Sequence, residues 1–335
     1  MKPLTRVFSF CAASMLLLVS GCGSNTGTPA PGPAFTLYVV QDGSAAMTNS
    51  VLEFPANGSG SITPSNTVTM PMQTVFNAVA VDTSGNLDTA GNLYVSASVV
   101  TAPPMLNEIL VYAPTATGAA TPTRTITSSS FSTFITSIAV DSTGEIYTLS
   151  GNSISVFAAN AATNATPARQ IAGNLTQLDS ATSIAVDAAQ NIYVANTAGN
   201  DILVFSSTET GNVAPAGILA GTSTEISAPS GVAVDSAGDI YAASFNQPSN
   251  SSLVVEFAPG ATGNASPTRT LTAVASGTLA GLAVDALDNL YVYTATSGQL
   301  AVDVFSPNQS GSSAPTRTIS STAWTAPNSG QIAVR

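Results

Sequence analysis

Ser137-Ile-Ala-Val-Asp141 is one copy of a five-residue phrase that recurs along the chain. Further copies end at Asp82, Asp187, Asp235 and Asp285, and a partial copy, Gln-Ile-Ala-Val, ends at Val334. Between Asp141 and Asp285 successive copies are 46, 48 and 50 residues apart. This period is typical of the four-stranded blades of a β-propeller. The phrase therefore predicts an all-β fold built as a propeller.

Each repeat contains four segments with the composition of β-strands. The Ile-Ala-Val-Asp segment leads into a short turn, a second strand such as Ile192–Val194 and a third such as Ile202–Phe205. A fourth segment carries the pattern Pro-x-Arg-x-Ile. Alternating apolar and small polar residues, rich in Val, Ile, Thr and aromatics, favour strands, and Gly, Asn and Asp mark the turns. We therefore expect antiparallel four-stranded blades and no long helix.

Aromatic residues give the number of blades. A tyrosine in each second strand and an aromatic residue in each third strand mark six repeats. The pairs are Tyr38 with Phe54, Tyr94 with Tyr112, Tyr147 with Phe157, Tyr193 with Phe205, Tyr241 with Phe257 and Tyr291 with Phe305. We expect these rings to fill the cores between blades. Because the first repeat lacks an inner strand, the C-terminal Gln-Ile-Ala-Val strand is predicted to pair into blade one and close the ring.

The N-terminal residues are predicted to be a targeting segment. Lys2 and Arg6 flank the start of an apolar stretch that is too short to span a membrane. The ending Val-Ser-Gly-Cys22 resembles the lipobox of bacterial lipoproteins; the alternative is an ordinary secretory signal. We predict a signal peptide over 1–21, a lipidated Cys22 with a flexible tether over 22–34, and a propeller over 35–335. Gly23 favours the outer membrane, with the acyl chains as the only membrane contact.

Composition excludes several kinds of chemistry. The chain has no histidine, and without the signal peptide it has no lysine and no thiol besides Cys22. Histidine-dependent triads, imidazole zinc ligands and lysine Schiff bases are therefore excluded. Five arginines remain against 18 carboxylates, a balance that argues against nucleic acid as a partner. The 44% apolar content predicts an ordered core.

One repeat carries a family resemblance. The stretches GVAVDSAGDIYAAS, starting at Gly231, and SLVVEFAPGATGN, starting at Ser252, resemble the NHL repeat, and the resemblance extends from Phe35 to Arg335. It implies a propeller and leaves the function open, because the family includes scaffolds, ligand-binding modules and enzymes. The chain departs from the family at positions where NHL units often have His-Arg. Those positions are Asn107-Glu108 and Asn200-Asp201 here.

Acidic residues at the ends of the inner strands form the first candidate site. They are Asp82, Asp141, Asp187, Asp235 and Asp285, joined by Asp88 in a duplicated turn of blade two. Carboxylates at these positions could hold a divalent cation such as calcium. In the alternative interpretation, each carboxylate accepts hydrogen bonds from the N–H groups of its own turn, and no cofactor is expected.

The loops between the second and third strands differ most among the blades. The spacing from tyrosine to aromatic residue across them is 16, 18, 10, 12, 16 and 14 residues. Variable loops on one side of a rigid frame are typical of a binding face. The candidate residues of this face are Asp42, Met105, Glu108, Asn196, Asp201, Phe245, Asn246 and Trp324. Trp324 has an alternative role, which is to pack in the seam where the ring closes.

Arginines recur in the predicted outer strands. They are Arg124, Arg169, Arg269 and Arg317, with Asn66 and Gly217 at the equivalent positions of blades one and four. We interpret the Pro-x-Arg pattern as protection of an edge strand against pairing with another chain. A role in ligand binding is the alternative.

Together these observations favour a non-enzymatic binding or scaffold lipoprotein of the bacterial cell envelope. It would be a monomer whose variable face holds a protein, peptide or glycan. The alternative is a divalent-metal-dependent hydrolase similar to gluconolactonase propellers, in which Asp201 or Glu108 would converge with Asn196 or Asn246 over the channel. A third hypothesis is an envelope-assembly factor, since some outer-membrane assembly lipoproteins are propellers.

Overall fold

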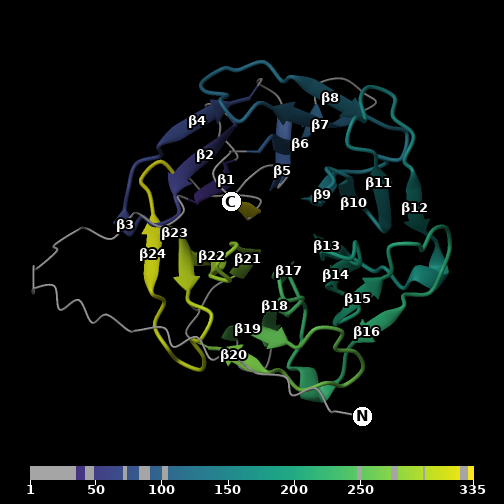
Figure 1. Cartoon of the computed structure of the whole chain (residues 1–335), viewed down its shortest axis with the longest axis vertical. Coiled ribbons are helices and arrows are strands. Elements are labelled where there is room, and N and C mark those ends of the chain that lie inside the picture. Colours follow the sequence, from purple (N-terminus) through teal and green to yellow (C-terminus); the bar gives the residue numbers. More distant parts are fainter. Residues whose placement is uncertain are drawn as a thin grey trace, which may run out of the picture. The chain divides into compact units, whose positions relative to one another are not determined.

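The computed structural model describes residues 35–41, 49–70, 74–82, 91–99, 105–246, 251–272, 278–296, 299–324 and 331–335. These residues belong to one compact unit and form six antiparallel sheets around a central axis (Figure 1). The predicted all-β, six-bladed propeller is confirmed. The helices within the described residues are two single 3₁₀ turns, η1 (Asn174–Thr176) and η2 (Thr222–Thr224). No described helix has the length and apolar character needed to cross a membrane.

Each blade has four strands that run from the axis outwards. Blade one contains β25 (Ile332–Val334), β1 (Thr36–Gln41), β2 (Ser50–Pro55) and β4 (Asn66–Thr69). Blade two contains β5 (Thr74–Val81), β6 (Leu93–Val99), β7 (Leu106–Tyr112) and β8 (Arg124–Thr127). Blade three contains β9 (Ile135–Val140), β10 (Ile146–Ser150), β11 (Ser153–Phe157) and β12 (Arg169–Ala172).

The second half of the ring repeats this order. Blade four contains β13 (Ala181–Val186), β14 (Ile192–Asn196), β15 (Asp201–Phe205) and β16 (Gly217–Leu219). Blade five contains β17 (Gly231–Val234), β18 (Ile240–Asn246), β19 (Ser251–Phe257) and β20 (Arg269–Leu271). Blade six contains β21 (Thr278–Val284), β22 (Leu290–Thr296), β23 (Gln299–Phe305) and β24 (Arg317–Ser320), and β3 (Gly60–Ser61) pairs with β24 in parallel.

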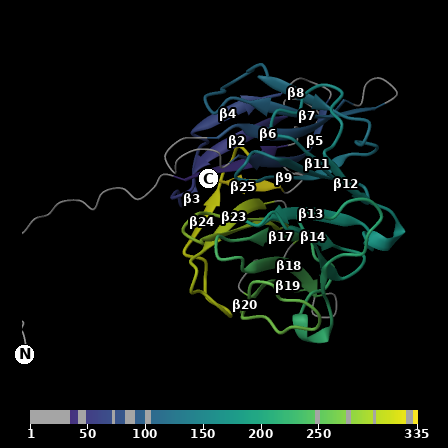
Figure 2. The ribbon, with the colours of Figure 1, turned by 45° about the vertical axis from the view of Figure 1, so that its right-hand side comes forward.

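The C-terminal strand closes the ring. β25 pairs antiparallel with β1, with Ile332 opposite Val39 and Val334 opposite Leu37. The six inner strands, β25, β5, β9, β13, β17 and β21, contact one another in turn around the axis. Figure 1 shows β5, β9, β13, β17 and β21 in this position, and Figure 2 shows β25 near β9. The predicted closure through blade one is therefore confirmed.

The hydrophobic core is divided into six clusters, and each cluster joins two neighbouring blades. Tyr147 of β10 packs with Ile192 and Leu203 of blade four, whereas Phe157 of β11 packs with Ile126 of blade two. In every blade the second-strand tyrosine faces the next blade and the third-strand ring faces the preceding one. The prediction that these rings form the inter-blade core is confirmed. Burial of one such ring contributes about 1.5–3 kcal/mol.

The antiparallel order gives the ring two different faces. The first and third turns of each blade lie on one side, which we call the first-turn face. The loops between second and third strands, and the connections between blades, lie on the other side, which we call the second-loop face. The sites described below are assigned to one of these two faces.

Candidate functional site

The inner-strand carboxylates are bound by the turns that follow them. Asp187 Oδ1 accepts hydrogen bonds from the backbone N–H groups of Ala189 at 2.9 Å and Asn191 at 2.8 Å. Asp141, Asp235 and Asp285 accept the equivalent pair of bonds. Such bonds stabilise a tight turn, because they satisfy N–H groups that no strand pairs. The hydrogen bonds agree with the turn interpretation of these aspartates.

A tyrosine six residues further on completes the arrangement. Tyr193 Oη donates a hydrogen bond to Asp187 Oδ2 at 3.1 Å, and the tyrosines of blades three, five and six do the same. Burial, and then the Asp187 carboxylate, raise the pKa of Tyr193 to about 12, so the phenol stays a donor at neutral pH. Sequence reasoning placed these tyrosines in the core only. The tyrosine follows the aspartate by six residues in blades three to six, and this constant spacing is the sequence feature that could have predicted the Asp–Tyr hydrogen bond.

Asp82 of blade two has a different environment. Its Oδ2 accepts hydrogen bonds from Asn92 Nδ2 at 2.8 Å and from Tyr94 Oη at 3.3 Å. Arg335 Nη1 lies 3.7 Å from Asp82 Oδ1 and donates to the Asp82 carbonyl oxygen at 2.5 Å. The side chain that follows β25 therefore balances the charge of this buried carboxylate.

A metal site is not evident among the described residues, which include no cluster of three or more His, Cys, Asp or Glu side chains suited to an ion. The candidates Cys22, Asp42 and Asp88 lie outside the described residues. Asp141, Asp187, Asp235 and Asp285 each accept bonds from the turn that follows, and Asp82 is bound by Asn92, Tyr94 and Arg335.

Asn196 and Asp201 are the two second-loop candidates that the structure brings together. Asn196 Nδ2 donates to Asp201 Oδ1 at 2.8 Å across the β14–β15 hairpin. Asn196 also donates to the Gln177 carbonyl oxygen and accepts from the Asp179 N–H, so it ties down the connection from blade three. Both side chains are at least nine-tenths buried, and burial raises the pKa of Asp201. Their contacts are those of a loop anchor.

The remaining second-loop candidates lie in different blades. Met105 precedes β7 and is exposed, while Glu108 within β7 is half-buried, which raises its pKa. Phe245 of β18 lines a cavity of about 210 Å³ beside Leu279. Asn246 ends the same strand, opposite Ser251.

Trp324 lies in the closure seam. Its ring stands edge-on to Phe54 of blade one, with centroids 5.2 Å apart, and to Tyr293 of blade six, with centroids 6.3 Å apart. The side chain is 7% exposed. This position corresponds to the seam-packing alternative stated above.

The outer-strand arginines connect neighbouring blades. Arg269 pairs with Glu256 and donates to the Gln309 carbonyl oxygen of blade six at 3.0 Å. Arg317 donates to the Ala56 carbonyl oxygen of blade one at 2.9 Å. Arg124, Arg169 and Asn66 likewise reach carbonyl oxygens of the next blade. These side chains therefore connect their own blade to the next one.

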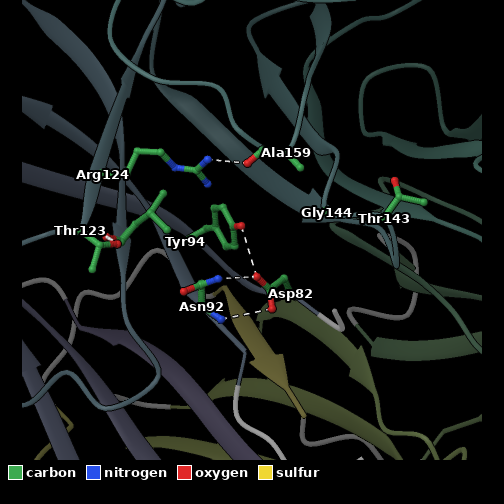
Figure 3. Close-up of a pocket in the computed structure, with 9 residues that line it drawn as sticks. Asp82, Asn92, Tyr94, Thr123, Arg124, Thr143, Gly144 and Ala159 are labelled. Atoms are coloured by element: carbon green, nitrogen blue, oxygen red, sulfur yellow. Dashed lines mark hydrogen bonds between the residues drawn. The ribbon is translucent and has the colours of Figure 1, made fainter. Parts of the chain in front are cut away.

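The first-turn face contains a cavity of about 430 Å³ between blades two and three. Its lining includes Val111, and Figure 3 shows Arg124 and Ala159 above Tyr94, Asp82 and Asn92 below it, and Thr143 to one side. In Figure 3, Tyr94 stands between Arg124 and the hydrogen-bonded pair of Asp82 and Asn92. A second hollow, of about 510 Å³, lies over the inner-strand ends of blades three to five.

The fold and the sites together define a six-bladed β-propeller that is stabilised by Asp–Tyr pairs and by arginine contacts between blades.

No protein-family model matches the chain, and no curated protein matches it. Solved structures match its fold. A candidate 6-phosphogluconolactonase from Bacteroides uniformis is 15% identical, with a TM-score of 0.53, over 83% of this chain and 80% of that one.

Two further structures are similar to the same extent. A protein of unknown function from Bacteroides caccae is 11% identical with a TM-score of 0.53, over 90% of this chain and 98% of that one. The WD40 domain of coronin from Toxoplasma gondii is 9% identical with a TM-score of 0.50, over 85% of this chain and 68% of that one. At these identities the likeness shows the propeller fold alone.

Proposed function

We propose that this chain is a non-enzymatic binding propeller, resembling NHL-repeat propellers, that is anchored to the bacterial cell envelope through lipidated Cys22. Its second-loop face holds a partner, for which a protein or peptide fits better than a glycan. The observation that carries the proposal is the exposure of large apolar side chains on that face. Met105, Leu106 and Phe134 are 39%, 48% and 39% exposed on second-loop or blade-connecting segments of blades two and three.

These side chains belong to one region of the face. Asn107, next to Leu106, donates from Nδ2 to the Phe131 carbonyl oxygen at 3.1 Å, so the β7 strand is joined to the connection that carries Phe134. Apolar side chains that remain exposed together in an envelope protein are typical of a surface that is covered by a partner. Variable loop length on the same face allows such a surface to differ from blade to blade.

The test is site-specific photo-cross-linking in intact cells. A photoreactive residue replaces Leu106 on the second-loop face or, as the matched control, Leu287, which is 53% exposed on the first-turn face. We expect a discrete cross-linked product from position 106 and none from position 287. Equal products from both positions, or a product from position 287 only, would contradict the proposal.

A Cys22→Ser variant tests the lipid anchor. We expect this variant to be lost from the membrane fraction, because it has no cysteine to lipidate.

A further inference from the structure

Arg124 has no ionic partner among the described residues, and in this it resembles Arg169 and Arg317 and differs from Arg269. In blade five, Arg269 pairs with Glu256, which stands opposite it in the β19–β20 register. The residue opposite Arg124 is Val111. Among the described residues the ion pairs are those of Arg269 with Glu256 and of Arg335 with Asp82. The Arg124 guanidinium donates to the Ala159 carbonyl oxygen and interacts with the Tyr94 hydroxyl, and a guanidinium carries five N–H donors, so donors remain for a ligand.

The space in front of this guanidinium results from a glycine. In the next seam, Gln190 occupies the third position after the turn aspartate, and its Nε2 donates to Asp141 of blade three at 2.7 Å. Gly144 occupies the same position after Asp141, with a comparable left-handed backbone. Gly144 has no side chain that could reach Asp82 as Gln190 reaches Asp141, and a Cβ at Gly144 would lie 3.1 Å from the Ala159 Cβ.

Between blades two and three, Arg124 of the outer strand and Gly144 of the following turn line the same cavity. Between blades four and five, the turn has Gly238, but Gly217 stands in place of the arginine. Between blades five and six, Arg269 meets a turn with Asp288 at the glycine position. Arg169, which also lacks an ionic partner, meets the turn with Gln190, and Arg317 reaches blade one, whose inner strand β25 is followed by Arg335. Among the described residues, an arginine without an ionic partner meets a turn with glycine at the cavity of Figure 3.

The lining suits an anionic group better than a cation. A guanidinium in a partly enclosed site binds carboxylate or phosphate oxygens through paired hydrogen bonds. The only carboxylate of the lining, Asp82, is 3% exposed and is already bound by Asn92, Tyr94 and Arg335. Thr123 and Thr143 also line the walls, and their hydroxyl groups donate to the Val111 carbonyl oxygen and to Asp141 Oδ1. The negative charge of the whole chain acts at longer range and is screened beyond about 8 Å at physiological ionic strength.

We propose that the cavity between blades two and three binds a small solute through an oxyanion, a carboxylate or a phosphate group, that pairs with Arg124. The volume of about 430 Å³ accommodates a solute of metabolite size. The hydroxyl oxygens of Thr123 and Thr143, whose protons are donated within the protein, can accept hydrogen bonds from the uncharged part of the solute. This site is on the first-turn face and does not depend on partner binding at the second-loop face.

The test is titration calorimetry on the purified full chain in low salt, with malate and inorganic phosphate as the two probes. Arg124→Gln removes the guanidinium charge. Val111→Glu keeps Arg124 but gives it an internal carboxylate, as Glu256 does for Arg269. Arg169→Gln is the matched control, because Arg169 reaches a carbonyl oxygen of the next blade but lies in the neighbouring seam. Circular dichroism verifies that each variant is folded.

We expect saturable binding of at least one probe, about tenfold weaker in both Arg124→Gln and Val111→Glu and unchanged in Arg169→Gln. Binding of malate alone identifies a carboxylate ligand, and binding of phosphate alone identifies a phosphate ligand. The proposal is wrong if neither probe binds the unmodified chain, if Arg124→Gln binds as well as the unmodified chain, or if Arg169→Gln loses as much affinity as Arg124→Gln.

Discussion

Tyr112 and Tyr193 show how differently two buried phenols can be accommodated. Tyr193 donates to Asp187, whereas Tyr112 Oη is buried without a hydrogen-bond partner. Burial, and then the Glu108 charge, raise the pKa of Tyr112 to about 12. The equivalent third-strand residue is phenylalanine in the other five blades. A buried polar group without a partner costs about 1–3 kcal/mol, so the hydroxyl of Tyr112 opposes folding.

The prediction at this scale is that Tyr112→Phe raises the free energy of unfolding by about 1 kcal/mol, because it removes an unsatisfied polar atom. Tyr193→Phe, the matched control, should lower it by about 1 kcal/mol, because it leaves Asp187 Oδ2 without one of its donors. The measurement is the midpoint of urea unfolding of each variant. A loss of stability in Tyr112→Phe similar to that in Tyr193→Phe would contradict this account.

The outer strands of the blades are covered by their neighbours. In four seams the third turn of the following blade forms a short parallel bridge to the outer strand, as Gly211 does to Ile171 and Gly311 to Leu271, and in the seam between blades six and one β3 pairs with β24. The arginines add bonds from side chain to backbone across the same seam. Arg269 is the most connected, since it binds Glu256, three carbonyl oxygens of blade six and the face of Tyr241.

Arg269→Gln is therefore expected to lower the free energy of unfolding by about 3 kcal/mol, because the half-buried Glu256 loses its counter-charge. Arg169→Gln, which breaks one hydrogen bond to the Glu209 carbonyl oxygen, should cost about 1 kcal/mol. Urea unfolding of both variants gives the comparison. Equal losses would show that the contact to the next blade, and not the ion pair, determines the effect.

Strand order and blade number were predictable at the scale of elements, because tyrosine and aromatic positions recur in every repeat. The place of the Pro-x-Arg pattern in the outer strand was also predictable. The partners of the arginines were not predictable. They are backbone carbonyl oxygens of another blade, which any residue type supplies, so the sequence does not indicate them. The cavity at Arg124 was missed for a related reason: Gly144 and Gln190 are both acceptable turn residues, and only the neighbouring blade makes them different.

At the scale of the whole ring, stability depends on one short strand. Because β25 comes from the opposite end of the chain to β1, its pairing joins sequence ends into one closed ring. Closure also completes the core between blades six and one, where Ile332 packs with Trp324 and Phe54. Arg335 adds the contact to Asp82 of blade two. A closed propeller has no open inter-blade gap, so loss of this strand should affect the two seams next to it first.

Deletion of residues 331–335 tests whether β25 holds the ring closed. It removes the strand pairing with β1 and the burial of Ile332, which together contribute on the order of 3 kcal/mol. Hydrogen exchange should accelerate in β1, which loses its inner partner, and change little in β14 on another part of the ring. Arg335→Gln is the control, because it keeps β25 and removes only the ion pair with Asp82. If exchange in β1 is as slow after the deletion as before it, β25 does not hold the ring closed. If Arg335→Gln accelerates exchange as much as the deletion does, the contact with Asp82 is what closes the ring, since that variant retains the paired strand.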